Sequence, residues 1–181
     1  LQSQTLSGAT ACNFTALKGA RYNTHLLQII NFSMDSSSSN EKFNIRFSND
    51  GGSSYETSNY EYGMQYGETD GTFGEIDSTS GTSIENFMFT ASTSSSCNSY
   101  VYFNNLNDAN EYSYARSQSV NYSSSSVQSF IMGFGCYKVT ELINGISIYG
   151  ESSSAFSGTA NLYGIKEIWI WDYLMIQVLV V

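Results

Sequence analysis

Side chains able to catalyse a reaction are few in this chain. It has one histidine, His25, and three cysteines, Cys12, Cys97 and Cys136. A Ser-His-Asp or Cys-His site would have to use His25, yet no GxSxG elbow or cysteine-centred motif accompanies it. The cysteines have no CxxC spacing, and with one histidine they do not outline a tetrahedral metal site. We therefore interpret His25 as structural and the cysteines as small buried hydrophobes, with a disulfide between two of them left open.

Carboxylates are the next candidates for chemistry or for cation binding. The densest group lies within residues 67–77 and consists of Glu68, Asp70, Glu75 and Asp77. Interleaved glycines predict an acidic loop there, but the spacing does not match a calcium-binding EF-hand loop, and no two carboxylates stand out as a glycosidase pair. The segment 133–135 has two glycines but lacks the lysine and helix of a phosphate-binding loop. We expect no catalytic residue, no cofactor and no metal ion, with weak calcium binding at the acidic loop as the alternative.

Tyrosine is the remaining side chain through which the protein could recognise a ligand. Seven tyrosines form two groups in the sequence, Tyr60, Tyr62 and Tyr66 in the first and Tyr100, Tyr102, Tyr112 and Tyr114 in the second. An exposed tyrosine ring can stack on a sugar, whereas alternating tyrosines in strands are usually packed with the hydroxyl at the rim. Packing is the favoured interpretation, and glycan recognition is the alternative.

Composition limits the classes of partner and of fold. Charged residues make up 13% of the 181 residues and aromatic residues 15%, while Ser, Asn, Thr, Gly and Tyr supply most of the polarity. Long surface helices need more Lys, Glu and Arg, whereas aromatic side chains suit a half-buried pleated sheet. The net charge of −9 argues against binding to nucleic acid or to an anionic membrane surface.

Short strands separated by polar turns are the dominant pattern of the sequence. Residues 42–48 alternate cleanly: we predict that Phe43, Ile45 and Phe47 point into the core and that Lys42, Asn44 and Arg46 face solvent or a neighbour. The next residues, 49–54, predict a turn in which two glycines take positive φ. Further strands are predicted at 25–32, 60–66, 84–90, 100–103, 115–122, 129–134, 143–149 and 159–165, with a weak helical period only at 138–143. About eight to ten short strands predict an all-β, jelly-roll-like antiparallel β-sandwich.

Three segments in order resemble a jelly-roll domain of tailed-bacteriophage virion proteins. They are Phe14-Thr-Ala-Leu followed by Tyr22 and residues 26–32, Phe43 to Tyr62 with its DGGS turn and NYEY, and Ile143 to Ile165 with its closing SGTANLYGI. The resemblance implies a non-enzymatic structural protein on the virion exterior, made in the host bacterial cytoplasm. Capsid decoration, head fibre and tail fibre are the roles it suggests, with self-association as a trimer and contacts to other virion proteins. The alternative is a receptor-binding module of a phage fibre that recognises a host-surface glycan.

The C-terminal segment departs from these apparent relatives. We predict a jelly-roll sandwich over residues 1–165 and an apolar tail over residues 166–181. The run 168–181 is shorter than the roughly 20 residues that span a bilayer, so we expect no membrane insertion. It is apolar on both faces of any strand, and we predict that it forms an assembly interface or an added strand. The proposed interface residues are Trp169, Trp171, Tyr173 and Ile176, and the alternative is a further strand in the protein's own sheet.

Overall fold

The computed structural model describes residues 1–17, 22–35, 41–90, 95–122 and 127–166, and these contain twelve strands and no helix. The strands are β1 (Gln2–Ala9), β2 (Ala11–Phe14), β3 (Thr24–Met34), β4 (Glu41–Ser48), β5 (Tyr60–Glu68), β6 (Phe73–Gly81), β7 (Ile84–Thr90), β8 (Cys97–Asn104), β9 (Ser113–Tyr122), β10 (Gln128–Tyr137), β11 (Gly145–Gly150) and β12 (Phe156–Ile165). In this part of the chain no helix is long and apolar enough to cross a membrane.

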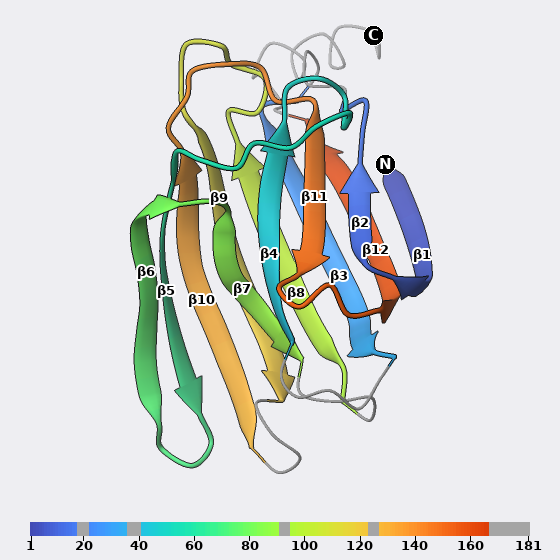
Figure 1. Cartoon of the computed structure of the whole chain (residues 1–181), viewed down its shortest axis with the longest axis vertical. Helices are drawn as coiled ribbons and strands as arrows, with labels where there is room; N and C mark the ends of the chain where they lie inside the picture. Colours follow the sequence, from blue (N-terminus) through green and yellow to red (C-terminus); the bar gives the residue numbers. More distant parts are fainter. Residues whose placement is uncertain (18–21, 36–40, 91–94, 123–126, 167–181) are drawn as a thin grey trace, which may run out of the picture.

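Two antiparallel sheets stack as a sandwich (Figure 1). The larger sheet has eight strands in the order β1-β12-β3-β8-β9-β10-β5-β6, and the smaller has four in the order β2-β11-β4-β7. The chain passes repeatedly from one sheet to the other, so neighbouring strands are often distant in sequence. The predicted all-β antiparallel sandwich is confirmed, with more strands than the predicted eight to ten.

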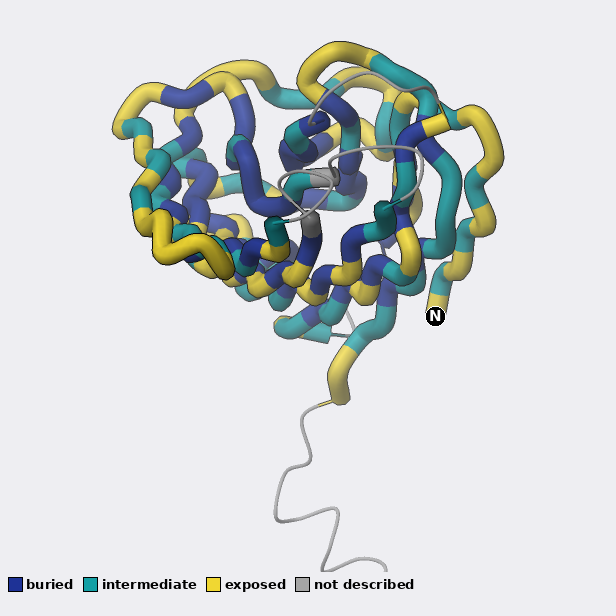
Figure 2. The backbone as a smooth tube through the Cα atoms, turned by 90° about the horizontal axis from the view of Figure 1, so that it is seen from below, coloured by how far each residue is buried: buried dark blue, intermediate teal, exposed yellow. Residues whose placement is uncertain are grey.

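The core lies between the two sheets, and its buried residues come from both layers, as the dark blue segments in Figure 2 show. Phe43, Ile45 and Phe47 are fully buried, as the alternation in β4 predicts. The Phe47 ring lies 6.0 Å from that of Tyr60, whose hydroxyl oxygen accepts a 2.8 Å hydrogen bond from the Phe47 N–H. Asn44 was predicted to face solvent or a neighbour, and it faces a neighbour. It is 6% exposed, and its side-chain oxygen accepts a hydrogen bond from the Asn86 N–H of β7.

The predicted turn after β4 is confirmed. Gly51 and Gly52 have φ of 77° and 88°. The Asp50 carboxylate accepts hydrogen bonds from the Ser48 hydroxyl at 2.8 Å and from the Ser54 N–H at 2.9 Å. The bonds from Ser54 and Ser48 lower the pKa of Asp50 to about 2. Local side-chain hydrogen bonds of this kind stabilise a turn.

Other local predictions are wrong. The acidic segment is not one loop: β5 runs to Glu68, a tight turn follows, and β6 carries Glu75 and Asp77. Because β6 is a polar edge strand with exposed residues along it, it lacks the apolar alternation that marks a half-buried strand. The sequence did not predict β1 either, because it is also a polar edge strand without apolar alternation. Residues 138–143, with their weak helical period, form no helix and connect β10 to β11.

Candidate functional site

The side chains with nucleophilic or acid–base chemistry do not form a site in the described part of the chain. His25 is 4% exposed, and burial lowers the pKa of its ring. Cys12, Cys97 and Cys136 are buried free thiols. Burial raises the pKa of all three, that of Cys12 to about 12, so the reactive thiolate is scarce near neutral pH. Within the described ranges no three His, Cys, Asp or Glu side chains group as metal ligands would.

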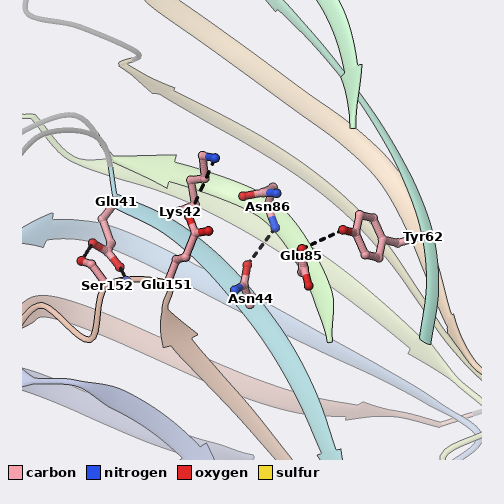
Figure 3. A network of polar contacts seen from close by, with 8 residues as sticks. All are labelled: Glu41, Lys42, Asn44, Tyr62, Glu85, Asn86, Glu151 and Ser152. Carbon is pink, nitrogen blue, oxygen red and sulfur yellow. Dashed lines mark hydrogen bonds and ion pairs between the residues drawn. The ribbon is translucent and has the colours of Figure 1, made fainter. Parts of the chain in front are cut away.

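Polar contacts along the smaller sheet, one of which reaches Tyr62 on β5 of the larger sheet, have a structural role (Figure 3). The buried Glu41 carboxylate accepts hydrogen bonds from the Ser152 N–H at 2.8 Å and from the Ser152 hydroxyl, which ties the β11–β12 turn to β4. The Tyr62 hydroxyl donates to Glu85 at 2.8 Å, and burial together with this carboxylate raises the pKa of Tyr62. Since these groups are engaged with one another, the network holds strands together rather than presenting a ligand site.

The two tyrosine groups have different environments. Tyr60 and Tyr62 are buried in the core, and Tyr66 is partly buried against it. Tyr100 and Tyr114 are 43% and 39% exposed on neighbouring strands of the larger sheet. Tyr102 is partly buried on β8, and Tyr112 is exposed in the loop before β9. Packing therefore accounts for the first group, whereas the second group includes exposed rings available to a ligand.

The outward-pointing side chains of the eight-stranded sheet form what we call the outer sheet face. In β9 the residues facing the core are small or short, and residues 114, 116, 118 and 120 between them are exposed. In β10 the large residues Met132 and Phe134 likewise point outward. Most large apolar side chains that are exposed in the described residues lie on this face, namely Phe73, Tyr100, Tyr114, Val120, Met132, Phe134 and Ile165.

Strand register arranges this face in rows across the sheet. From β12 to β6, one row of successive cross-strand partners is Tyr163, Leu26, Tyr102, Arg116, Phe134, Gly63 and Asp77. The adjacent row is Asn161, Gln28, Tyr100, Gln118, Met132, Gln65 and Glu75. Rings and other apolar side chains thus share these rows with amide, guanidinium and carboxylate groups, at the spacing of about 4.8 Å between strands.

One position in the first row, Gly63, has no side chain and opens a shallow hollow. This Gly63 depression has a volume of about 770 Å³ and lies across β5, β6, β9 and β10. Its outward side chains are Gln65, Glu75, Asp77, Arg116, Met132 and Phe134. The Phe134 ring lies beside Gly63, 3.6 Å from where a Cβ atom would be. A second depression of about 470 Å³ lies on the same face around Tyr100 and Gln118.

Hydrogen bonds and ring contacts also join neighbouring side chains of the outer sheet face. The Tyr100 hydroxyl donates to the Gln118 side chain, and the Tyr100 and Tyr102 rings meet edge to face at 6.0 Å. The ion pairs within the described residues join Lys42 to Glu151 and Lys138 to Glu61, so Arg116 belongs to neither. This arrangement can stack on and hydrogen-bond a ligand.

Sequence reasoning identified only part of this surface. It named Tyr100, Tyr102 and Tyr114, and it named Glu75 and Asp77 as loop residues. It missed Arg116, Met132 and Phe134. The available signal was the alternation of large and small residues in 114–121 and 129–135, which defines two faces but does not say which one is covered. The predicted interface residues Trp169, Trp171, Tyr173 and Ile176 lie outside the described residues.

Among known proteins this chain has a weak structural neighbour. No protein-family model matches the chain, and no curated protein matches it. The CBM2 module of the evolved Dit protein of Lactobacillus casei BL23 phage J-1 is a weak structural neighbour at 6% identity. The match covers 91% of this chain and 77% of that one, with a TM-score of 0.25. A similarity at that level does not establish a shared topology.

Proposed function

We propose that this protein is a non-enzymatic structural component on the exterior of a tailed-bacteriophage particle, a capsid-decoration, head-fibre or tail-fibre protein. We further propose that the outer sheet face is the surface through which it contacts another molecule. One observation carries this second part: the exposed apolar side chains gather on one face of a sandwich whose core is otherwise well covered. Apolar patches of this kind mark interaction surfaces in soluble proteins.

The phage assignment rests on the ordered sequence resemblance from Phe14 to Ile165. The sandwich agrees with it, because the DGGS turn and the closing segment 156–165 form a turn and a strand as the resemblance implies. The buried His25 and thiols and the scattered carboxylates favour a role in packing and binding over catalysis.

Locating the chain in purified virions tests this assignment. We expect its peptides in gradient-purified particles, and we expect antibodies raised against the sandwich to label intact particles in electron micrographs. Antibodies against the major capsid protein and against an internal virion protein serve as controls for exposure. Absence from particles, or labelling only after the particles are opened, would show the assignment to be wrong.

Recognition of a host-surface glycan is a second candidate function, and the pattern of side chains on the outer sheet face favours it. Rings that can stack on sugars lie beside amide and charged groups that can hydrogen-bond hydroxyls, as for Tyr100 with Gln118 and Phe134 with Arg116. A glycan array probed with the full-length protein tests this function. We expect Tyr100→Ala to weaken binding and Tyr149→Ala, which removes a partly exposed ring from the smaller sheet, to leave it unchanged.

A further inference from the structure

We propose that the Gly63 depression is a subsite for one neutral pyranose ring of a glycan, and that it discriminates against acidic sugars. This inference rests on the candidate glycan-binding function and gives it a location and a substrate class. Three features support it: an exposed apolar platform, hydrogen-bonding groups on two sides of that platform, and the balance of charge around it.

The platform is formed by two neighbouring outward side chains of β10. Phe134 is 57% exposed and Met132 is 42% exposed. Gly63, the cross-strand partner of Phe134, has no side chain, and the edge of the Phe134 ring lies over it. A pyranose has a face of C–H groups that can pack on such a ring, and burying that apolar surface removes it from water.

Hydrogen-bonding groups flank the platform from both sides. On one side β6 contributes Glu75 and Asp77, which point outward together because they are two residues apart on a strand. On the other side β9 contributes Arg116, the partner of Phe134. Three strand spacings, or about 14 Å, separate the backbones of Arg116 and Asp77. The side chains of Arg116 and Asp77 take up part of this distance, and the part that remains is on the order of one sugar ring.

The chemistry of these groups suits hydroxyls. Carboxylates accept hydrogen bonds from sugar hydroxyls, and a guanidinium donates to hydroxyl or ring oxygens. Gln65, between them in the neighbouring row, can do both. A ring that presents several hydroxyls around its edge, with an apolar face below, satisfies the groups of both sides at once.

Charge selects between classes of sugar. Two carboxylates and one guanidinium line the depression, and the whole chain carries a net charge of −9. A uronic or sialic acid would gain one favourable contact with Arg116 but would meet two like charges across the recess. A neutral hexose avoids that repulsion and still uses every hydrogen-bonding group, so we expect neutral glycans to bind better.

The test titrates the full-length protein, monitored by chemical-shift changes in NMR, with two series of probes. One series holds neutral oligomers of glucose, galactose, mannose and N-acetylglucosamine, and the other holds oligouronates and sialylated oligosaccharides. We expect a neutral probe to perturb the backbone amides around Gly63. Phe134→Ala should weaken binding about tenfold, which is about 1.4 kcal/mol, and the control Tyr149→Ala, on the smaller sheet, should not change it.

Charge removal gives a second readout that a purely structural effect would not reproduce. The double variant Glu75→Gln, Asp77→Asn keeps the shapes of both side chains and removes the repulsion. We expect this double variant to lower the ratio of the affinity for neutral probes to the affinity for acidic probes. Arg116→Gln should instead weaken the binding of both series. A wild-type preference for acidic glycans would overturn the proposal.

The remaining outcomes separate this proposal from the function on which it rests. If no glycan of either series binds the wild type, glycan recognition itself is wrong and the subsite falls with it. If a glycan binds, and Tyr100→Ala abolishes binding while Phe134→Ala does not, the function stands and the subsite is wrong. If Phe134→Ala instead reduces the oligomeric mass measured by light scattering, the face joins copies of the chain, and that also overturns the proposal.

Discussion

Ile45 is the middle residue of the buried trio in β4, and it pairs with strands on both sides, with Ile148 in β11 and Ile84 in β7. Its side chain is fully buried, so Ile45→Ala should leave a cavity and lower the free energy of unfolding by about 2–5 kcal/mol. Chemical denaturation measures this loss. Lys42→Ala, on the exposed face of the same strand, is the control: its side chain is 44% exposed, and loss of its surface ion pair should cost about 1 kcal/mol or less. Equal losses for the two variants would contradict the assigned faces of β4.

His25 gives the protein a predictable response to acid. Burial lowers the pKa of the folded-state ring below its ordinary value of 6.5, and its Nδ1 atom has no hydrogen-bond partner in the described structure. The unfolded state therefore binds more protons once the pH falls below about 6.5, and stability falls as the pH drops from there toward the folded-state pKa. We expect the melting temperature to decrease between pH 7.5 and pH 5.

His25→Phe isolates this contribution, because it keeps an aromatic ring beside Tyr22 but cannot take up a proton. Its melting temperature should decrease less over the same pH range than that of the wild type. Asp50, with a pKa near 2, titrates below this range and does not obscure the result. An identical decrease in both proteins would mean that His25 is not the group responsible.

Strands β9 and β10 show how one element constrains the side chains of another. The Ile84 side chain of β7 lies so close to β10 that a Cβ atom on Gly135 would come within 2.5 Å of it. The core-facing positions 115 and 117 of β9 are likewise small, an alanine and a serine. At positions 133 and 135 there is no space for a side chain on the inside, and the large residues beside them, Met132 and Phe134, lie on the outside, where they form the platform of the Gly63 depression.

Gly133 offers a test of this close packing. A Cβ atom there would lie 2.2 Å from the Gly63 carbonyl oxygen and 2.5 Å from the Met64 sulfur, so Gly133→Ala must displace backbone. We expect it to lower the free energy of unfolding by about 1–3 kcal/mol or more.

Gly63→Ala on the paired strand is the matched control for Gly133→Ala. Its Cβ atom would meet only the Phe134 ring, at an ordinary 3.6 Å, and the change in stability should be within about 0.5 kcal/mol. Both variants are compared by chemical denaturation. A Gly133→Ala variant as stable as Gly63→Ala would show that the strands can move apart freely.

At the scale of the whole molecule, the role of the C-terminal tail in assembly remains a prediction. We expect deletion of residues 168–181 to lower the oligomeric mass measured by light scattering while the sandwich keeps its melting temperature, because the predicted role of Trp169 and Trp171 is in assembly. A truncation between residues 176 and 177, which keeps both tryptophans and Ile176, is the control. An unchanged oligomer would contradict the interface. A large fall in melting temperature would instead assign the tail to the protein's own core.

Composition and local pattern were enough to predict an all-β sandwich, the buried trio of β4 and the turn at residues 49–54, because each leaves a local signature in the sequence: aromatic and hydroxyl-rich composition, period-two alternation, and paired glycines after an aspartate. They were not enough to predict the candidate site. Alternation in β9 and β10 separates two faces equally well whichever one is covered, and the larger side chains would ordinarily be assigned to the core. Only the tertiary structure, with β7 packed close against the backbone of β10, decides that Phe134 and Met132 face solvent. Likewise only strand register brings Arg116, Phe134 and Asp77, far apart in sequence, into one row.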